Sequence, residues 1–148
     1  MLVAQGEAVF PSHSEDFSST EISAIDTSTG ILCGRPYGGV ALLWKRSVFQ
    51  NVSVIQCNNP HICSIKVVLQ EKSFVVMSVY IPTDSLANLM DFMDVLSLVS
   101  AIIDSYGENY ILGDYNKHPS ERFYHELTQF CLEQDWTCVG TELLGFYK

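Results

Sequence analysis

The sequence predicts an α+β fold with two-layer or sandwich packing, and three observations lead to this prediction. Several short apolar runs with strand character come first, and their connections are short enough for antiparallel neighbours. A helix, a further apolar run and a second helix follow in that order, which favours layered α+β packing. The 148 residues are 47% hydrophobic and 17% charged, which is typical of one globular domain with a buried core.

The first half of the chain is predicted to consist mostly of strands. Residues 1–20 show no sustained period and are expected to be irregular. Residues 21–26 alternate weakly, and a glycine-rich loop at 34–39 then leads into a continuous apolar run. The strands expected from this run onward are Val40–Trp44, Asn51–Cys57, Ile62–Leu69 and Ser73–Ile81.

The hydrophobic period changes after Pro82, which ends the preceding strand. A helix is expected over Leu86–Ile103, and Thr83 or Ser85 can cap its start. Two aspartates inside this stretch make it an amphipathic helix and not a membrane span. The stripe predicted to face the core consists of Leu86, Leu89, Met90, Met93, Leu96, Val99 and Ile103.

The last third is predicted to contain the central strand of the sheet and a second helix. The apolar run Tyr110–Leu112 is the expected central strand. Pro119 and Glu121 are both favoured in a first helical turn, so the second helix should begin there. Trp136–Val139 is expected to be a closing strand. The inner stripe of the second helix is predicted to be Phe123, Leu127, Phe130 and Cys131.

The candidate functional residues follow the predicted central strand. Its apolar run ends in Gly113, and Asp114 and Asn116 come next, two residues apart. Residues with this spacing in an extended segment point to the same side, and strand ends are where open α/β sheets bind ligands. A carboxylate can hold a hard cation or accept a proton, and an amide can orient a phosphate oxygen. This pattern indicates metal-assisted hydrolysis; the alternative is an ordinary polar turn, because both residues are common in turns.

Charge and cysteine content limit the classes of function. A net charge of −9 argues against non-specific nucleic-acid binding, although a nuclease can use a local basic patch and bound cations. Lys45-Arg46 is the only adjacent basic pair, and a solvated strand end explains it. The five cysteines form no C-x-x-C pair, so we expect reduced thiols in an intracellular protein of the nucleus or cytoplasm. No secretion signal is expected, because the N-terminus lacks a basic region followed by an apolar block.

One histidine lies among the cysteines. His61 falls between Cys57 and Cys63, a grouping that could suggest a metal cluster. A loop with incidental ligand types is the favoured interpretation.

Three motifs in this order resemble the endonuclease/exonuclease/phosphatase superfamily. They are Gly38–Trp44, Ser78–Thr83 and Leu112–Asn116. Within it, the chain is similar to the apurinic-endonuclease-like domain of non-LTR (LINE-type) retrotransposon proteins, from about residue 30 to the end. The resemblance implies a two-sheet β-sandwich flanked by helices, here incomplete, as a single partial domain over residues 1–148 with 21–148 family-like. It also implies a DNA-nicking reaction that depends on Mg²⁺ or Mn²⁺, although the negative charge weakens the expectation of DNA as partner.

The resemblance assigns roles to individual residues. Asp114 would position or deprotonate the attacking water near the metal. Asn116 would contact the scissile phosphate, and the hydroxyl of Tyr80 would support the phosphate or the metal shell. His118 is a further candidate for a phosphate contact, whereas His125 is expected on the outer face of its helix.

The chain departs from the family pattern near both ends. Either Glu7 supplies the family's metal-binding glutamate in a shifted register, or Gly6 has replaced that ligand. A preceding strand with another active-site asparagine is missing. The second aspartate and the final Asp-His pair are not found before Lys148. We therefore expect an internal part of the domain, impaired as a hydrolase.

Two other functions remain open at this point. The first is a catalytically dead fragment that acts as a protein-interaction module or has no function, with self-association through uncovered sheet faces. The second is a phosphatase acting on lipid or inositol phosphates, which no residue specifically favours. We expect no membrane partner.

Overall fold

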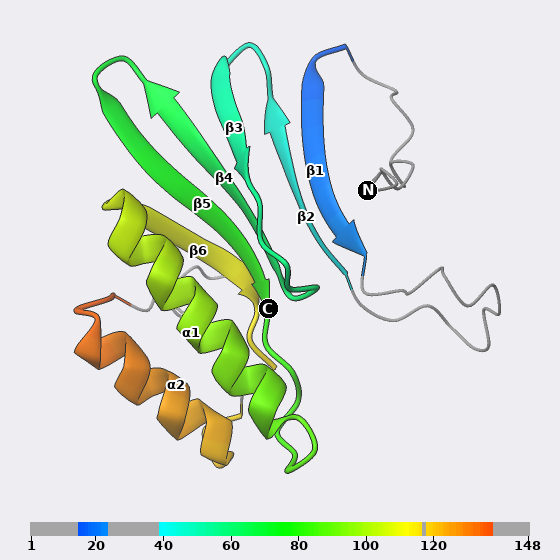
Figure 1. Cartoon of the computed structure of the whole chain (residues 1–148), viewed down its shortest axis with the longest axis vertical. Helices are drawn as coiled ribbons and strands as arrows, with labels where there is room; N and C mark the ends of the chain where they lie inside the picture. Colours follow the sequence, from blue (N-terminus) through cyan, green and yellow to red (C-terminus); the bar gives the residue numbers. More distant parts are fainter. Residues whose placement is uncertain (1–14, 24–38, 117, 138–148) are drawn as a thin grey trace, which may run out of the picture.

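The structure is a computed structural model that describes residues 15–23, 39–116 and 118–137. Strands come first and two helices follow, separated by the last strand (Figure 1). This order confirms the α+β class. The elements are β1 (Phe17–Ser23), β2 (Gly39–Lys45), β3 (Asn51–Ile55), β4 (Ile62–Leu69), β5 (Lys72–Tyr80), α1 (Leu89–Tyr106), β6 (Asn109–Asp114) and α2 (Arg122–Glu133).

The strands form two sheets. β1 and β2 pair along their whole length as an antiparallel two-stranded sheet. The other sheet has the order β3-β4-β5-β6, in which β3, β4 and β5 are antiparallel neighbours, as their short connections predicted. β6 instead runs parallel to β5, because α1 carries the chain back to the start of the sheet.

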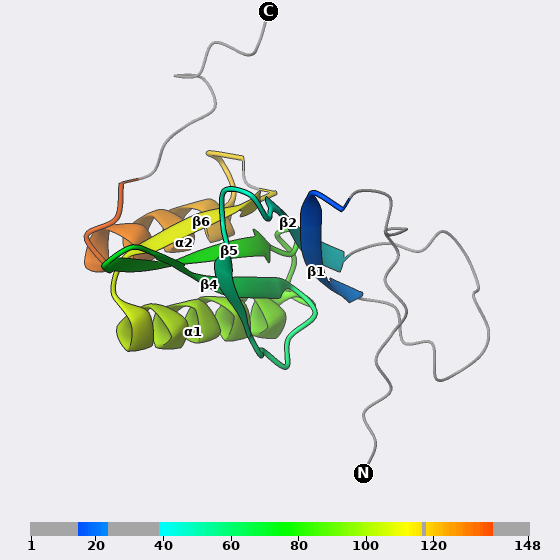
Figure 2. The same ribbon diagram turned by 90° about the horizontal axis from the view of Figure 1, so that it is seen from above.

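The two faces of the four-stranded sheet are covered by different elements. The alternation of β5 sends Val75, Met77 and Val79 into a cluster with α1. Phe74, Val76 and Tyr80 point to the opposite face. There, Val40 and Leu42 of β2 pack against alternate residues of β4. The small sheet and the helices therefore lie on opposite sides of the larger sheet (Figure 2).

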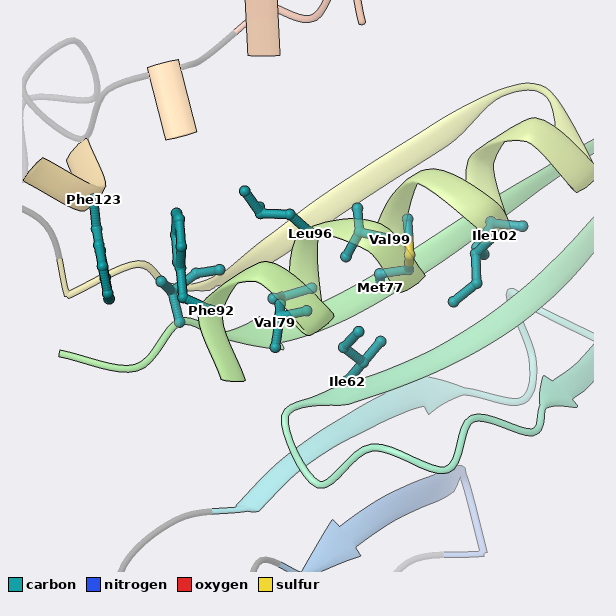
Figure 3. Close-up of a cluster of buried hydrophobic side chains, with 11 residues drawn as sticks. Ile62, Met77, Val79, Phe92, Leu96, Val99, Ile102 and Phe123 are labelled. Carbon is teal, nitrogen blue, oxygen red and sulfur yellow. The ribbon is translucent and has the colours of Figure 1, made fainter. Parts of the chain in front are cut away.

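Two stacked phenylalanines join the helices to each other. The rings of Phe92 in α1 and Phe123 in α2 lie 4.2 Å apart and nearly parallel, and both side chains are fully buried (Figure 3). Burying one such side chain contributes roughly 1.5–3 kcal/mol. Phe123 and Cys131 are buried, and Leu127 and Phe130 are partly buried, so the predicted inner stripe of α2 is confirmed.

The start of α1 differs from the prediction. The helix begins at Leu89, after the N-cap residue Asn88, whose side chain makes no cap hydrogen bond. The backbone N–H of Asn88 donates to Ser85 Oγ at 3.2 Å, and its Nδ2 donates to the carbonyl oxygen of Thr83 at 3.0 Å. The two predicted capping residues therefore build a turn in front of the helix. Neither α1 nor any other helix in the described ranges is long and apolar enough to cross a membrane.

The predicted core stripe of α1 is confirmed only in part: Leu96 and Val99 are buried, and Leu89 and Ile103 pack against the helical cluster. Leu86, Met90 and Met93 are 82%, 69% and 51% exposed. The buried residues of α1 are Phe92, Val95, Leu96, Val99 and Ile102, so the core face of the helix also includes Phe92, Val95 and Ile102, which were not predicted. Apolar residues occur on two sides of this helix, so the helical period alone did not show which side faces the core. In the observed rotation of the helix, Phe92 stacks on Phe123.

The prediction that Tyr110–Leu112 is a central strand is also wrong. Among the described strands, β6 pairs only with β5 and forms an edge of the sheet. Ile111 packs into the helical cluster, but Tyr110 and Leu112 are 57% and 59% exposed on the opposite face. The small sheet reaches β4 and β5 and leaves these two side chains uncovered.

The predictions for residues 17–26 and 136–139 were less accurate. Phe17–Thr20 was expected to be irregular but belongs to β1, because it pairs with β2. The weak strand signal ends at Ser23, and residues 24–26 lie outside the described residues. Trp136 is not in a strand and packs edge-on against Phe130. The remainder of the expected closing strand, residues 138–139, is not described.

Candidate functional site

Two adjacent strands end where the candidate residues lie. Tyr80 is the last residue of β5 and pairs in register with Asp114, the last residue of β6. The backbone N–H of Ile81 donates to the carbonyl oxygen of Asp114 at 2.9 Å, which continues the pairing beyond both strands. Paired residues of parallel strands share a face, so Tyr80 and Asp114 lie side by side on the face opposite the helices.

Gly113 allows β6 to approach β5 closely at this end. Its φ is +157°, and a Cβ at this position would lie 1.8 Å from the carbonyl oxygen of Val79. No side chain fits into that space. The glycine therefore has a packing function one residue before Asp114.

A polar turn, and not strand alternation, positions Asn116. The strand ends at Asp114, and Asn116 has a φ of +42°, a left-handed conformation that asparagine tolerates better than most residues. Asp114 Oδ1 accepts the backbone N–H of Asn116 at 2.9 Å. Asn116 Nδ2 donates to the carbonyl oxygen of Ile81 at 3.2 Å. The expected same-side alternation is thus wrong, but the turn still fixes the amide beside the end of β5.

Tyr80 is half-buried and is held by a residue that the sequence did not assign to the site. The ring of His61 stacks on the ring of Tyr80 with centroids 5.6 Å apart and an angle of 21° between the planes. The backbone N–H of Tyr80 donates to the carbonyl oxygen of His61 at 2.9 Å. Asn59 Oδ1 accepts the backbone N–H of His61 at 2.8 Å and fixes the loop. His61 stands directly before β4, and its contact with Tyr80 follows from the register of β4 with β5, which no local sequence pattern shows.

His118 and His125 take up different positions. His118 is exposed, with its Nδ1 2.8 Å from Ser120 Oγ and its backbone N–H donating to Glu121 Oε2. These contacts tie His118 to the turn before α2, and no recorded contact joins it to Asp114. His125 is exposed on α2, as predicted.

The donor set for a cation is small. Asp114 has an exposed carboxylate, whereas Glu7 lies outside the described residues. No group of three or more His, Cys, Asp or Glu side chains within the described ranges could hold a metal ion. Mg²⁺ usually keeps several water ligands and takes only one or two carboxylates together with substrate phosphate oxygens. Asp114 fits this limited requirement as a single protein ligand.

A second carboxylate near the end of β5 has a structural role. Asp84 Oδ2 accepts the backbone N–H of Phe123 at 3.2 Å, in the first turn of α2. It thereby satisfies one of the N–H groups that have no partner inside the helix.

The cysteines of the described residues are not joined in disulfides. Cys57, Cys63 and Cys131 form no disulfide, and Cys33 and Cys138 are outside the description. Burial raises the pKa of the Cys57 and Cys63 thiols, and Cys63 Sγ donates to the carbonyl oxygen of Thr20 at 3.6 Å. Cys63 is buried and Cys57 is partly buried.

The basic pair is exposed at the end of β2. Both Lys45 and Arg46 are exposed, and Arg46 Nε donates to Ser18 Oγ at 2.6 Å. Arg46 therefore connects the end of β2 to β1. The exposure of both side chains is as predicted for a solvated strand end.

Comparison of the sequence with protein-family models and with curated proteins gives no match. The geometry of Tyr80, Asp114 and Asn116 therefore has to support any functional assignment by itself.

Proposed function

We propose that the chain is part of a metal-dependent phosphodiester hydrolase domain of the endonuclease/exonuclease/phosphatase type, similar to the DNA-nicking endonuclease of non-LTR retrotransposon proteins. One observation carries the proposal. Tyr80 and Asp114 are paired in register at adjacent strand ends, and the side chain of Asn116 is hydrogen-bonded to Ile81, the residue that follows β5. A carboxylate, an amide and a phenol thus gather at one edge.

Each side chain has a chemical role in this proposal. Asp114 orients or deprotonates the attacking water, because its carboxylate is exposed and can accept a proton. Asn116 uses one amide N–H on the carbonyl oxygen of Ile81, and an amide nitrogen carries two hydrogens, so one N–H remains for a phosphate oxygen. Tyr80 presents its hydroxyl from a ring that His61 holds in place.

The proposed cation is Mg²⁺ or Mn²⁺. Asp114 would hold it, with Glu7 as a second candidate ligand. When bound, such an ion polarises the phosphoryl oxygen and lowers the pKa of a bound water. We expect the rate of phosphodiester hydrolysis to be low. His118 is engaged in its own turn and the ring of His61 is stacked on Tyr80, and losing an imidazole that contacts the phosphate costs roughly 10²–10⁴ in rate.

The same proposal includes a β-sandwich fold. The two sheets would be an incomplete β-sandwich, with β1 and β2 forming one side. The cluster of Val40 and Leu42 with alternate residues of β4 supports this arrangement. The uncovered Tyr110 and Leu112 mark the face of β6 that a complete sandwich would bury.

A plasmid-nicking assay tests the activity. The full chain should convert supercoiled plasmid to the nicked form in Mg²⁺ but not in EDTA. Asp114→Ala should lower the rate by about 10²-fold or more, because it removes both the proton acceptor and the proposed metal ligand. Glu71→Ala, at the exposed turn between β4 and β5, is the matched control and should nick like the unmodified chain.

Two outcomes contradict the proposal. Equal nicking by Asp114→Ala and the unmodified chain identifies a contaminating nuclease. No nicking by any preparation that melts cooperatively favours the second candidate, a non-catalytic interaction module. The exposed apolar pair Tyr110 and Leu112 at the sheet edge is the observation that supports this module. Monomeric behaviour in light scattering, without binding of an apolar dye, would contradict the module.

A further inference from the structure

A groove between α1 and α2 is not used by the proposed function. The two helices lie side by side and run in the same direction, as Figure 1 and Figure 2 both show. The groove has a volume of about 480 Å³. Its apolar lining includes Met93, Leu96 and Phe130, and its carboxylates are Asp104, Glu126 and Glu133.

The electrostatics of the groove are strongly one-sided. Because the helices are parallel, the negative poles of both helix dipoles lie at the same end. Neither last turn contains a basic residue, and Asp104 and Glu133 occupy those turns instead. Such carboxylates are unfavourable at a helix C-terminus, where a cation would stabilise the chain. The charge pattern therefore disfavours folding and favours a cationic ligand.

The cations of the helical layer lie elsewhere. The two helices contain five acidic residues and one basic residue, a net charge of −4. That basic residue, Arg122, begins α2 at the opposite end of the groove. Lys66 lies 5.6 Å from the centre of the Tyr106 ring and does not line the groove.

The apolar surface beside the groove extends along α1. Met90 and Met93 are exposed on the helix face that continues into the groove, in the stripe that the sequence predicted to be buried. Methionine side chains adapt to different partners and are frequent in surfaces that bind amphipathic helices. An apolar strip with acidic walls is complementary to a helix with one apolar and one basic face.

We propose that this groove binds a basic amphipathic α-helix of a partner protein. Apolar residues at positions i, i+4 and i+7 of that helix contact Met93, Leu96 and Phe130. Its lysines or arginines lie over Asp104, Glu126 and Glu133. This inference is independent of the hydrolase proposal, because the groove shares no residue with the site at Tyr80 and Asp114.

A peptide titration tests the inference on the full chain. The probe is a fluorescein-labelled peptide of about 16 residues, roughly 24 Å long as a helix, with leucines on one face and lysines on the other. Its anisotropy should rise on binding, and the affinity should fall as salt increases from about 50 to 300 mM. Matched peptides carry glutamates in place of the lysines, or the same residues in scrambled order.

A charge-reversal variant separates binding from folding. Asp104→Lys combined with Glu133→Lys should weaken peptide binding about tenfold, since it reverses two favourable charges. The same variant should melt at a higher temperature than the unmodified chain, because it places cations at two helix C-termini. Glu71→Lys, outside the groove, should change the affinity less than about twofold.

Amide shifts in an NMR titration locate the binding surface. The inference requires shifts along α1 and α2 when the lysine peptide is added. It is overturned if the lysine peptide does not bind, if the glutamate or scrambled peptide binds equally well, or if the double variant behaves like Glu71→Lys. Shifts that follow protein concentration and not peptide identify a second copy of the chain as the occupant, which also overturns it.

Discussion

At the scale of single residues, Gly113 determines how closely the two site strands approach. The neighbouring carbonyl of Val79 occupies the space where a side chain would begin. Most glycines are replaceable at a modest entropic cost, but this one is constrained by contact as well as by conformation. The geometry of Asp114 therefore depends on a residue without any chemistry of its own.

We expect Gly113→Ala to destabilise the fold strongly. A Cβ 1.8 Å from a backbone oxygen forces β6 away from β5, at a cost of roughly 3 kcal/mol or more. Urea unfolding measures this loss. The control is Gly107→Ala. At Gly107 φ is +81° and an added Cβ would meet no atom within 4 Å, so only backbone strain of about 1 kcal/mol is expected. Equal losses for the two variants would contradict the packing function.

The residues that could be predicted from the sequence were those with a local signal. Asp114 and Asn116 stand directly after an apolar run, and a turn between them was one of the two interpretations. His61 could not be assigned, because its stacking on Tyr80 depends on the register of β4 with β5, which no local pattern encodes. The function of Asp84 was missed for the same reason, since its partner lies 39 residues away.

At the scale of elements, the start of α2 depends on the segment that follows β5. Glu121, the N-cap residue, makes no side-chain cap hydrogen bond, and Asp84 accepts an N–H from the first turn in its place. A carboxylate at a helix N-terminus also interacts favourably with the helix dipole. One side chain therefore connects α2 to the end of the sheet.

We expect Asp84→Ala to destabilise the protein by about 1–2 kcal/mol, because it leaves an N–H of α2 without its partner and removes the charge. Asp84→Asn retains an acceptor oxygen and should recover much of this loss. Thermal and urea unfolding would measure both. A cost for Asp84→Asn as large as for Asp84→Ala would assign the effect to charge and contradict the hydrogen-bond explanation.

The types of the elements were predicted more accurately than their faces. Strand alternation and helical period identified β2 to β5 and both helices, because burial imposes those periods on the sequence. The predicted core face of α1 was only partly right, and β6 was predicted to be a central strand but lies at the edge of the described sheet. Both depend on which apolar surface finds a partner, and a sequence with methionines and leucines around a helix does not specify that choice.

At the scale of the whole molecule, stability should depend on pH through two cysteine thiols, one buried and one partly buried. Burial raises the pKa of Cys57 and Cys63 above the ordinary value of 9.0. As pH rises, the unfolded chain therefore loses these protons before the folded chain does. The resulting contribution to the free energy of unfolding is fully present well below pH 9 and is lost as pH rises through the higher folded pKa values.

Urea unfolding between pH 7 and 10.5 should show this decline. A Cys57→Ala/Cys63→Ala double variant starts from a lower stability but should decline less steeply, because lysines and tyrosines titrate equally in both proteins. Parallel declines would assign the alkaline loss to those other groups and contradict a contribution from the thiols.

The parallel pairing of β5 with β6 also has a consequence for the order of folding. β3, β4 and β5 are joined by short connections and can pair early, because closing a short loop loses little entropy. Tyr80 and Asp114 meet only after residues 81–113, including all of α1, have closed a long loop. The candidate site should therefore form in a late kinetic phase, so an intermediate can already contain most of the sheet while it has none of the proposed chemistry.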